Sequence, residues 1–101
     1  MLKKKYLKSR PACKVTFSLP VQAAEGAGEI RLVGDFNNWS LHGHRMKKLK
    51  NGDYGITLNL KPGREYQFRY LLDNNNWKND DNADKFVPSP FGDSKNSVIA
   101  T

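Results

Sequence analysis

The sequence predicts a single all-β domain built as a two-layer sandwich. Three observations support this prediction: several short stretches alternate polar and apolar residues, turn-forming residues separate these stretches, and no stretch repeats apolar residues at the 3.6-residue period of a helix. The chain of 101 residues is long enough to bury one hydrophobic core and too short to divide comfortably into two domains. We therefore expect one core enclosed by strands.

The first predicted strand covers residues 14–19 and alternates polar and apolar residues strictly. Pro20 ends it. A polar, glycine-containing loop over residues 21–28 should then lead to a second strand at 29–34, which resumes the alternation. The side chains expected to face the core from these two strands are Val15, Phe17, Leu19, Ile30 and Leu32.

The middle of the chain contains the strongest hairpin signal. An Asn-Gly pair at positions 51–52 is typical of a tight turn, and an alternating strand follows at 54–60. Met46 and Leu49, which precede the turn, are expected to return to the core. A Pro-Gly pair at positions 62–63 makes the next turn.

Residues 65–72 form the longest predicted strand. Tyr66, Phe68 and Tyr70 should share one face, and Gln67, Arg69 and Leu71 the other. A polar turn at 73–76 delivers Trp77, a long acidic and Asn-rich loop continues to residue 90, and a short strand at 96–101 closes the chain. Strands that recur with turns between them favour an immunoglobulin-like β-sandwich.

The positive charge of the chain is concentrated at its start. The formal net charge is +7, and without the six cations of residues 3–14, 11 of the 17 basic residues remain against 10 acidic ones. We therefore divide the chain into a basic tail at 1–11 and a folded domain at 12–101. Clustered lysines attract phosphate, so such a tail could contact nucleic acid or an anionic membrane, but our prediction is a solvated, frayed terminus.

Cys13 is the only cysteine of the chain. This excludes an internal disulfide and a cysteine-based zinc cluster, and it fits a reducing cytoplasm. No apolar segment follows the basic start, and no apolar run reaches the length of a membrane span. We expect a cytoplasmic protein without a secretion signal or membrane insertion, in which Cys13 is a buried or half-buried structural thiol.

The sequence contains no signature of a catalytic centre, so we expect neither an enzyme nor a cofactor. Asp80, Asp81 and Asp84 lie in one loop, whereas the paired acids of glycoside hydrolases face each other across a bound sugar. We expect these aspartates in a solvated or calcium-tolerant loop. His42 and His44 are two metal ligands without a third, and an exposed loop is the better interpretation.

Trp39 and Trp77 are the residues that indicate a function. Each follows an Asn-rich turn, and loops tend to display exposed functional side chains. A hexose can lay its C–H groups flat on an indole ring, while its hydroxyls bond to neighbouring polar side chains. The pattern favours a sugar-binding platform, and the alternative is that one or both rings close the ends of the core.

Several motifs resemble the isoamylase N-terminal early-set family. They are Ile-Arg-Leu-Val-Gly-Asp-Phe-Asn-Asn-Trp-Ser at 30–40, the strand at 66–70 with Asp73 and Trp77, and Asn-Ser-Val at 96–98. The same pattern marks the glycogen-binding domain of the AMP-activated protein kinase beta subunit, and motifs between residues 79 and 88 look most similar to small free-standing bacterial members. The resemblance covers about residues 12–101. It implies an immunoglobulin-like sandwich that binds α-1,4-linked glucans such as glycogen, starch or maltooligosaccharides without cleaving them.

The resemblance also implies roles for individual residues. In the glycogen-binding relatives, tryptophans stack on glucose rings at the positions of Trp39 and Trp77. A basic residue contacts the glucan at the position of Arg69, an asparagine bonds sugar hydroxyls at the position of Asn96, and an apolar residue leans into the curve of the glucan near Phe91. The kinase relatives carry lysine at the position of Arg69, and two loops are each one residue longer here. Stacking should therefore be kept, while detailed contacts change.

Our leading prediction is a non-catalytic module that binds α-glucan, with Lys78 as a further polar contact. The alternative is an interaction or regulatory module that docks on an enzyme of glycogen metabolism or another partner through its tail or a sheet edge, without binding sugar. This alternative is kept because the domain often serves as an architectural neighbour of a catalytic barrel in isoamylase and branching enzymes. No motif supports a nucleic-acid ligand, no membrane contact is expected, and the sequence leaves the oligomeric state open.

Overall fold

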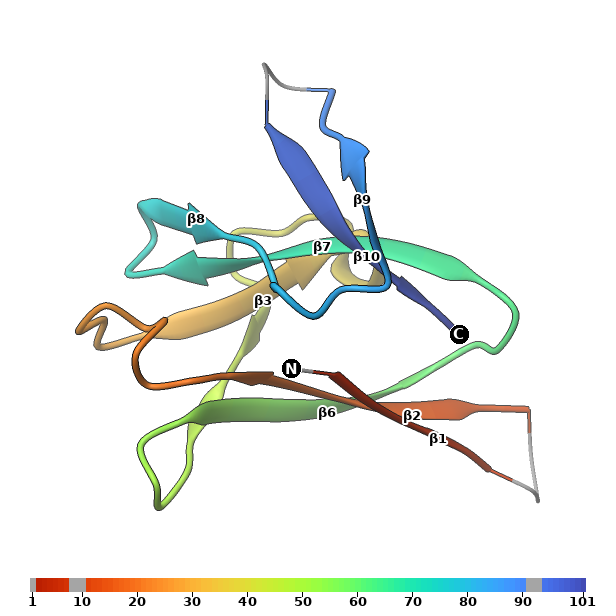
Figure 1. Cartoon of the computed structure of the whole chain (residues 1–101), viewed down its shortest axis with the longest axis horizontal. Coiled ribbons are helices and arrows are strands. Elements are labelled where there is room, and N and C mark those ends of the chain that lie inside the picture. Colours follow the sequence, from red (N-terminus) through yellow and green to blue (C-terminus); the bar gives the residue numbers. More distant parts are fainter. Residues whose placement is uncertain (1, 8–10, 91–93) are drawn as a thin grey trace.

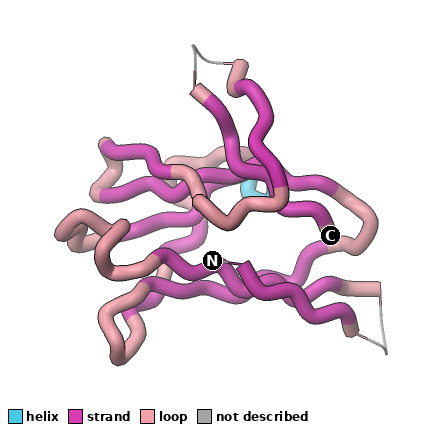
Figure 2. The backbone as a smooth tube through the Cα atoms, in the orientation of Figure 1, coloured by secondary structure: helices cyan, strands magenta, loops and turns pink. Residues whose placement is uncertain are grey.

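The computed structural model describes residues 2–7, 11–90 and 94–101, which form ten strands in two sheets (Figures 1 and 2). The strands are β1 Leu2–Tyr6, β2 Cys13–Leu19, β3 Ile30–Gly34, β4 His44–Arg45, β5 Lys47–Lys48, β6 Tyr54–Leu60, β7 Glu65–Leu72, β8 Asn76–Lys78, β9 Lys85–Pro88 and β10 Lys95–Ala100. A short 3₁₀ helix, η1 Asp35–Asn37, follows β3.

The two sheets are antiparallel and stack as a sandwich, as predicted. The first sheet has the strand order β1-β2-β6-β5, and the second has the order β4-β3-β7-β10-β9. β3 pairs with one edge of β7. Two strands share the other edge of β7: β10 pairs with residues 65–68 and β8 with residues 70–72. In Figure 1, the layer with β1, β2 and β6 lies below the layer with β3, β7 and β10.

The hydrophobic core fills the space between the two sheets. The five predicted inward-facing residues of the first two predicted strands are all buried, and Met46 joins them. Aromatic rings form the centre, because Phe17 meets Phe68 edge to face with ring centroids 5.1 Å apart and Phe68 meets Tyr70 at 5.8 Å. The alternation of polar and apolar residues in β2, β3 and β7 therefore places the core as predicted.

The N-terminal residues form an edge strand, which corrects the prediction of a frayed terminus. β1 pairs with β2 from Leu2 opposite Phe17 to Tyr6 opposite Cys13. Lys4 forms an ion pair at 2.7 Å with Asp84, which directly precedes β9, and the Tyr6 hydroxyl donates to the backbone carbonyl of Thr101. A charged segment becomes a strand here because the open edge of β2 offers backbone partners.

Three segments predicted as loop contain strands, and one predicted core residue is exposed. His44 lies on β4, which pairs with β3, β8 carries Trp77, and β9 pairs Lys85–Pro88 with β10, so each segment finds backbone partners that no local pattern reveals. Leu49 is 45% exposed because it follows β5 on the outer side of the first sheet, where it packs over Gly55. The prediction that Leu49 returns to the core is therefore wrong.

Asp80 is buried, which corrects the prediction of a solvated acidic loop at this position. Its carboxylate accepts a hydrogen bond from the Tyr70 hydroxyl at 2.7 Å, and its backbone N–H donates to the Ser97 hydroxyl at 2.9 Å. Burial raises the pKa of Tyr70, and the negative charge and hydrogen bond of Asp80 act in the same direction. Asp80 anchors the connection between β8 and β9 to the second sheet.

Cys13 is buried and unpaired, as predicted, and both histidines of the 42–44 segment are exposed. Within the described residues, no group of three or more His, Cys, Asp or Glu side chains could hold a metal ion. The described part of the chain also contains no helix that is long and apolar enough to cross a membrane.

Candidate functional site

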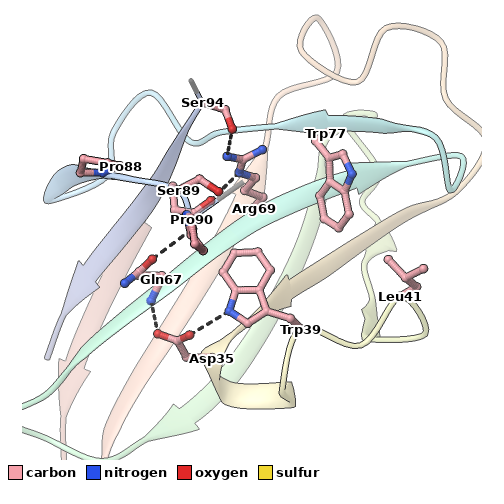
Figure 3. Close-up of a pocket in the computed structure, with 11 residues that line it drawn as sticks. Asp35, Trp39, Leu41, Gln67, Arg69, Trp77, Pro88, Ser89, Pro90 and Ser94 are labelled. Atoms are coloured by element: carbon pink, nitrogen blue, oxygen red, sulfur yellow. Dashed lines mark hydrogen bonds between the residues drawn. The ribbon is translucent and has the colours of Figure 1, made fainter. Parts of the chain in front are cut away.

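A groove of about 990 Å³ lies on the outer face of the second sheet, on the side of β7 that points away from the core (Figure 3). This volume is in the upper part of the range for small-molecule sites. Strand alternation places Gln67, Arg69 and Asn96 at the floor of the groove, because their neighbours along β7 and β10 point into the core. The lining residues are Asp35, Trp39, Leu41, Gln67, Arg69, Trp77, Pro88, Ser89, Pro90, Ser94 and Asn96.

Trp39 enters the groove from the turn that follows η1. Its backbone is left-handed with φ 57°, and Asn38 has φ 56°, a conformation that costs about 1 kcal/mol for a residue with a side chain. Two hydrogen bonds hold Trp39 there: its backbone N–H donates to the Gly34 carbonyl at 2.9 Å, and its indole N–H donates to Asp35 Oδ1 at 2.8 Å. The ring is therefore held at both its backbone and its edge.

The turn under Trp39 depends on Asn37 and Gly43. Asn37 accepts the Gly34 N–H at 3.0 Å and donates to the Leu32 carbonyl at 2.9 Å, which closes the turn onto β3. A Cβ atom at Gly43 would lie 2.7 Å from both Asn37 Nδ2 and the Leu32 carbonyl oxygen. Only glycine fits at this close approach, so the small residue in the 42–44 segment has a structural reason.

Trp77 reaches the same groove from β8, where it lies opposite Leu71 of β7. The hairpin between the two strands has left-handed backbone at Asp73, whose carboxylate accepts the backbone N–H groups of Gly28 and Glu29 at 3.0 Å each. This ties the hairpin to the start of β3. Trp77 is 40% exposed, whereas its cross-strand partner Leu71 is buried. Part of the indole is therefore accessible to a ligand.

Arg69 lies at the groove floor in a fixed orientation. Its Nε donates to Asn96 Oδ1 at 2.6 Å, and one terminal nitrogen donates to the Ser94 hydroxyl at 2.9 Å. Asn96 in turn donates to Gln67 Oε1 at 3.0 Å. Figure 3 shows both indole rings and the Arg69 side chain bordering one space, with Leu41 at its far rim. Apolar rings beside an ordered cation can bind a ligand that has apolar faces and hydroxyl groups.

Comparison with known proteins identifies the family. Residues 17–99, most of the chain, match the family described as the glycogen recognition site of AMP-activated protein kinase. The chain belongs to this family. As a glycogen-recognition domain, it is a β-sandwich of the early-set type and a non-catalytic module that binds α-glucan.

A curated relative of this glycogen-recognition domain is Protein PTST homolog 2, chloroplastic, from Arabidopsis thaliana. The two are 39% identical over 54 residues, which cover 54% of this chain and 10% of the plant protein. The chain therefore spans about a tenth of that relative's length. This plant relative gives no support to the expected similarity to free-standing bacterial members.

The structure brings four of the six predicted site residues of the glycogen-recognition domain together: Trp39, Trp77, Arg69 and Asn96 all line the groove. Lys78 does not line it. It follows Trp77 on β8, so its side chain lies on the other side of the strand and binds Glu25 at 2.7 Å. The hydrogen bond and positive charge of Lys78 hold the pKa of Glu25 below its ordinary value. Phe91 lies outside the described residues.

Sequence reasoning missed several groove residues, and only some of them carry a local signal. Gln67 precedes Arg69 by two positions on one strand, so the alternation that places Arg69 outward also places Gln67 there. Asp35 is inside the motif that carries the resemblance, but its bond to the indole of Trp39 needs the folded turn. Pro88 reaches the groove only because β9 pairs with β10, a long-range contact without a local sequence signal.

Proposed function

We propose that the groove between Trp39 and Trp77 is the α-glucan site of this glycogen-recognition domain. Both indole rings would stack on glucose rings, and Arg69 would donate hydrogen bonds to sugar hydroxyls. The observation that supports this proposal most strongly is that two tryptophans from separate elements open onto one groove that also contains an ordered arginine. The family supplies the ligand class, and the groove is the feature of this chain that suits it.

Arg69 is suited to this role because its orientation is set before the ligand arrives. Two of its five N–H groups bond to Asn96 and Ser94, and the others can point toward hydroxyls. Asn96 is only 4% exposed, and its side-chain oxygen already accepts from Arg69. We therefore propose that Asn96 acts mainly by positioning Arg69, rather than by bonding sugar directly, and that Lys78 contributes little.

The expected affinity is modest. Trp77 exposes 40% of its surface, which is roughly 100 Å² for a side chain of about 250 Å². If a glucose ring covers this area, about 25 cal/mol per Å² gives an upper value near 2.5 kcal/mol. Trp39 is half-buried and contributes less than Trp77. The two rings together, less the cost of ordering the ligand, place short oligosaccharides near the boundary between micromolar and millimolar Kd. Strong retention then requires several domains or sites on one polymer.

Affinity electrophoresis in gels that contain glycogen tests the proposed site. Trp39→Ala and Trp77→Ala should each migrate faster than the wild type in the glycogen gel and equally in a gel without glycogen. Phe86→Ala is the matched control, because Phe86 is an aromatic residue with a similar exposed fraction of 43% and does not line the groove. Retention of both tryptophan variants at the wild-type position would reject the groove as the glucan site.

A second proposal concerns the setting in which the domain acts. The matched segment is a tenth of the Arabidopsis relative, so domains of this type occur beside much longer segments. We propose that this protein works in the cytoplasm and brings an enzyme of glycogen metabolism to the polymer; the single buried thiol of Cys13 is compatible with a reducing compartment. When the protein is mixed with a purified glycogen branching enzyme in the absence of glycogen, the two should sediment as one complex. Independent sedimentation would argue against this partner, and cell fractionation checks the compartment.

A further inference from the structure

The first sheet presents a second surface, on the side of the molecule away from the glucan groove. We name it the basic face and define it by the exposed cations Lys3, Lys5, Lys14, Arg45 and Lys47. Strand register places the lysines on the outer side. Lys3 and Lys5 lie opposite Thr16 and Lys14, which alternate with the buried residues of β2, and Lys47 lies opposite Gly55. Arg45 belongs to β4, at the edge of the second sheet, and it lines the same shallow hollow as Lys47.

Charge is segregated between the two sheets. The four strands of the first sheet contain no acidic residue, whereas the ion pairs among the described residues involve Glu25, Glu29, Glu65 and Asp84, all outside this sheet. None of the five cations of the basic face takes part in those ion pairs. Lys5 and Lys14 lie directly opposite each other on neighbouring strands, an arrangement in which like charges destabilise a sheet. An anionic partner would relieve this repulsion.

A hollow of about 360 Å³ lies beside the lysines. It is lined by Thr16, Arg45, Lys47, Leu49, Gly55, Ile56 and Thr57. Gly55 leaves room for the hollow because it has no side chain. The hydroxyls of Thr16 and Thr57, which also line the hollow, form a hydrogen bond with each other at 3.0 Å. Leu49, which is 45% exposed, adds an apolar wall. The hollow thus combines two cations, two hydroxyls and an apolar side chain.

We propose that the basic face docks an acidic segment of another protein, in which carboxylates meet the lysines and an apolar side chain enters the hollow against Leu49. A protein segment supplies both kinds of group, whereas a phosphate backbone supplies only the charge. The register places no aromatic side chain on the outer side of β1, β2 or β6 for a base to stack on. Arginine is the residue that favours phosphate and base contacts, whereas four of the five cations here are lysines. This composition also favours a protein partner over nucleic acid.

The four lysines of the basic face and the glucan groove lie on opposite layers of the sandwich, as the separation of β1, β2 and β6 from β7 and β8 in Figure 1 shows, and Arg45 joins the lysines from the edge strand β4 of the second sheet. An acidic partner and a glucan can therefore bind at the same time. The glycogen-recognition domain then acts as an adaptor: one face holds the polymer and the other holds a protein. This inference does not depend on where the glucan binds.

Fluorescence anisotropy with the full chain tests the inference. The probe is a labelled peptide of glutamates around one central leucine, measured at about 0.15 M salt to limit long-range attraction. The variant Lys5→Gln/Lys14→Gln/Lys47→Gln should raise the Kd of the peptide about tenfold. The control Lys78→Gln/Lys85→Gln/Lys95→Gln removes the same charge from the second sheet and should change the Kd less than about threefold.

Three further measurements separate the outcomes. A peptide with serine in place of leucine should bind more weakly to the wild type, and Leu49→Ser should abolish that difference. Equal losses in the two triple variants would overturn the inference, because net charge rather than the basic face would then decide binding. Tighter binding of an oligothymidine with the same charge would also overturn it, in favour of nucleic acid. The ratio of the mobility of the first triple variant in a glycogen gel to its mobility in a gel without glycogen should equal that of the wild type, which keeps this test distinct from that of the groove.

Discussion

The hydrogen bonds of Asp35 give a quantitative prediction about how the groove holds Trp39. The carboxylate of Asp35 accepts the indole N–H of Trp39 at 2.8 Å and the backbone N–H of Gln67 at 2.7 Å. Asp35→Ala removes both bonds. A hydrogen bond to a charged group contributes about 1.5–3 kcal/mol when buried and less at an exposed position, so we expect a loss of about 2 kcal/mol in unfolding free energy. For a domain of this size, the Tm should fall by about 10 °C.

The effect of Asp35→Ala on affinity has a separate physical origin. Without its bond to Asp35, the indole of Trp39 samples several rotamers and must be ordered again when glucan binds. Immobilising such a side chain costs about 0.5–1.5 kcal/mol. The Kd for maltoheptaose should therefore rise about 2- to 12-fold. Isothermal titration calorimetry well below the Tm of the variant measures this change.

Asp53→Ala provides a matched control. Asp53 also accepts one backbone N–H, from Val21 at 2.9 Å, and one side-chain N–H, from Asn51 at 3.1 Å, but it lies outside the groove. The two variants should lose similar stability, and only Asp35→Ala should lose affinity. Equal affinity of the two variants for maltoheptaose would refute the view that Asp35 holds the ring ready for binding.

Three other predictions concern Lys78, Asp84 and Tyr70. Lys78→Ala should leave the retardation by glycogen, measured against a gel without glycogen, at the wild-type value, because Lys78 does not line the groove; a weaker retardation would show that Lys78 belongs to the site. Burial opposes ionisation of Asp84, but hydrogen bonds from Lys4 and a backbone amide, together with the Lys4 charge, hold its pKa below the ordinary value. Asp84 therefore stabilises the fold above about pH 4 and loses this effect as the pH falls through its folded pKa, so Asp84→Asn should flatten the fall in urea-unfolding stability between about pH 5 and pH 3. Tyr70→Phe leaves the buried carboxylate of Asp80 with one donor fewer and should cost about 1–3 kcal/mol in urea unfolding; an unchanged midpoint would show that the bond contributes nothing net.

The alternation in β2, β3, β6 and β7 predicts most of the fold correctly because the pleat of a strand is a local property. A side chain two positions from a core residue shares its face whatever the strand pairs with. The outward position of Arg69 and the burial of Phe68 both follow from this rule. Local patterns fail where a strand exists only because another edge is open, as for β1 and β9.

The sequence alone determined the fold class, the core faces of the long strands, the family pattern and the two tryptophans that mark the groove. Only the tertiary structure decided which polar residues surround them. It turned Lys78 away from Trp77, buried Asn96 beneath Arg69 and placed Asp35 at the indole edge of Trp39. The physical reason is that burial and hydrogen-bond partners of a polar side chain depend on segments far away in the chain, whereas strand periodicity depends on neighbouring residues. The basic face likewise needs the pairing of β1 with β2, which turns a run of lysines into one side of a sheet.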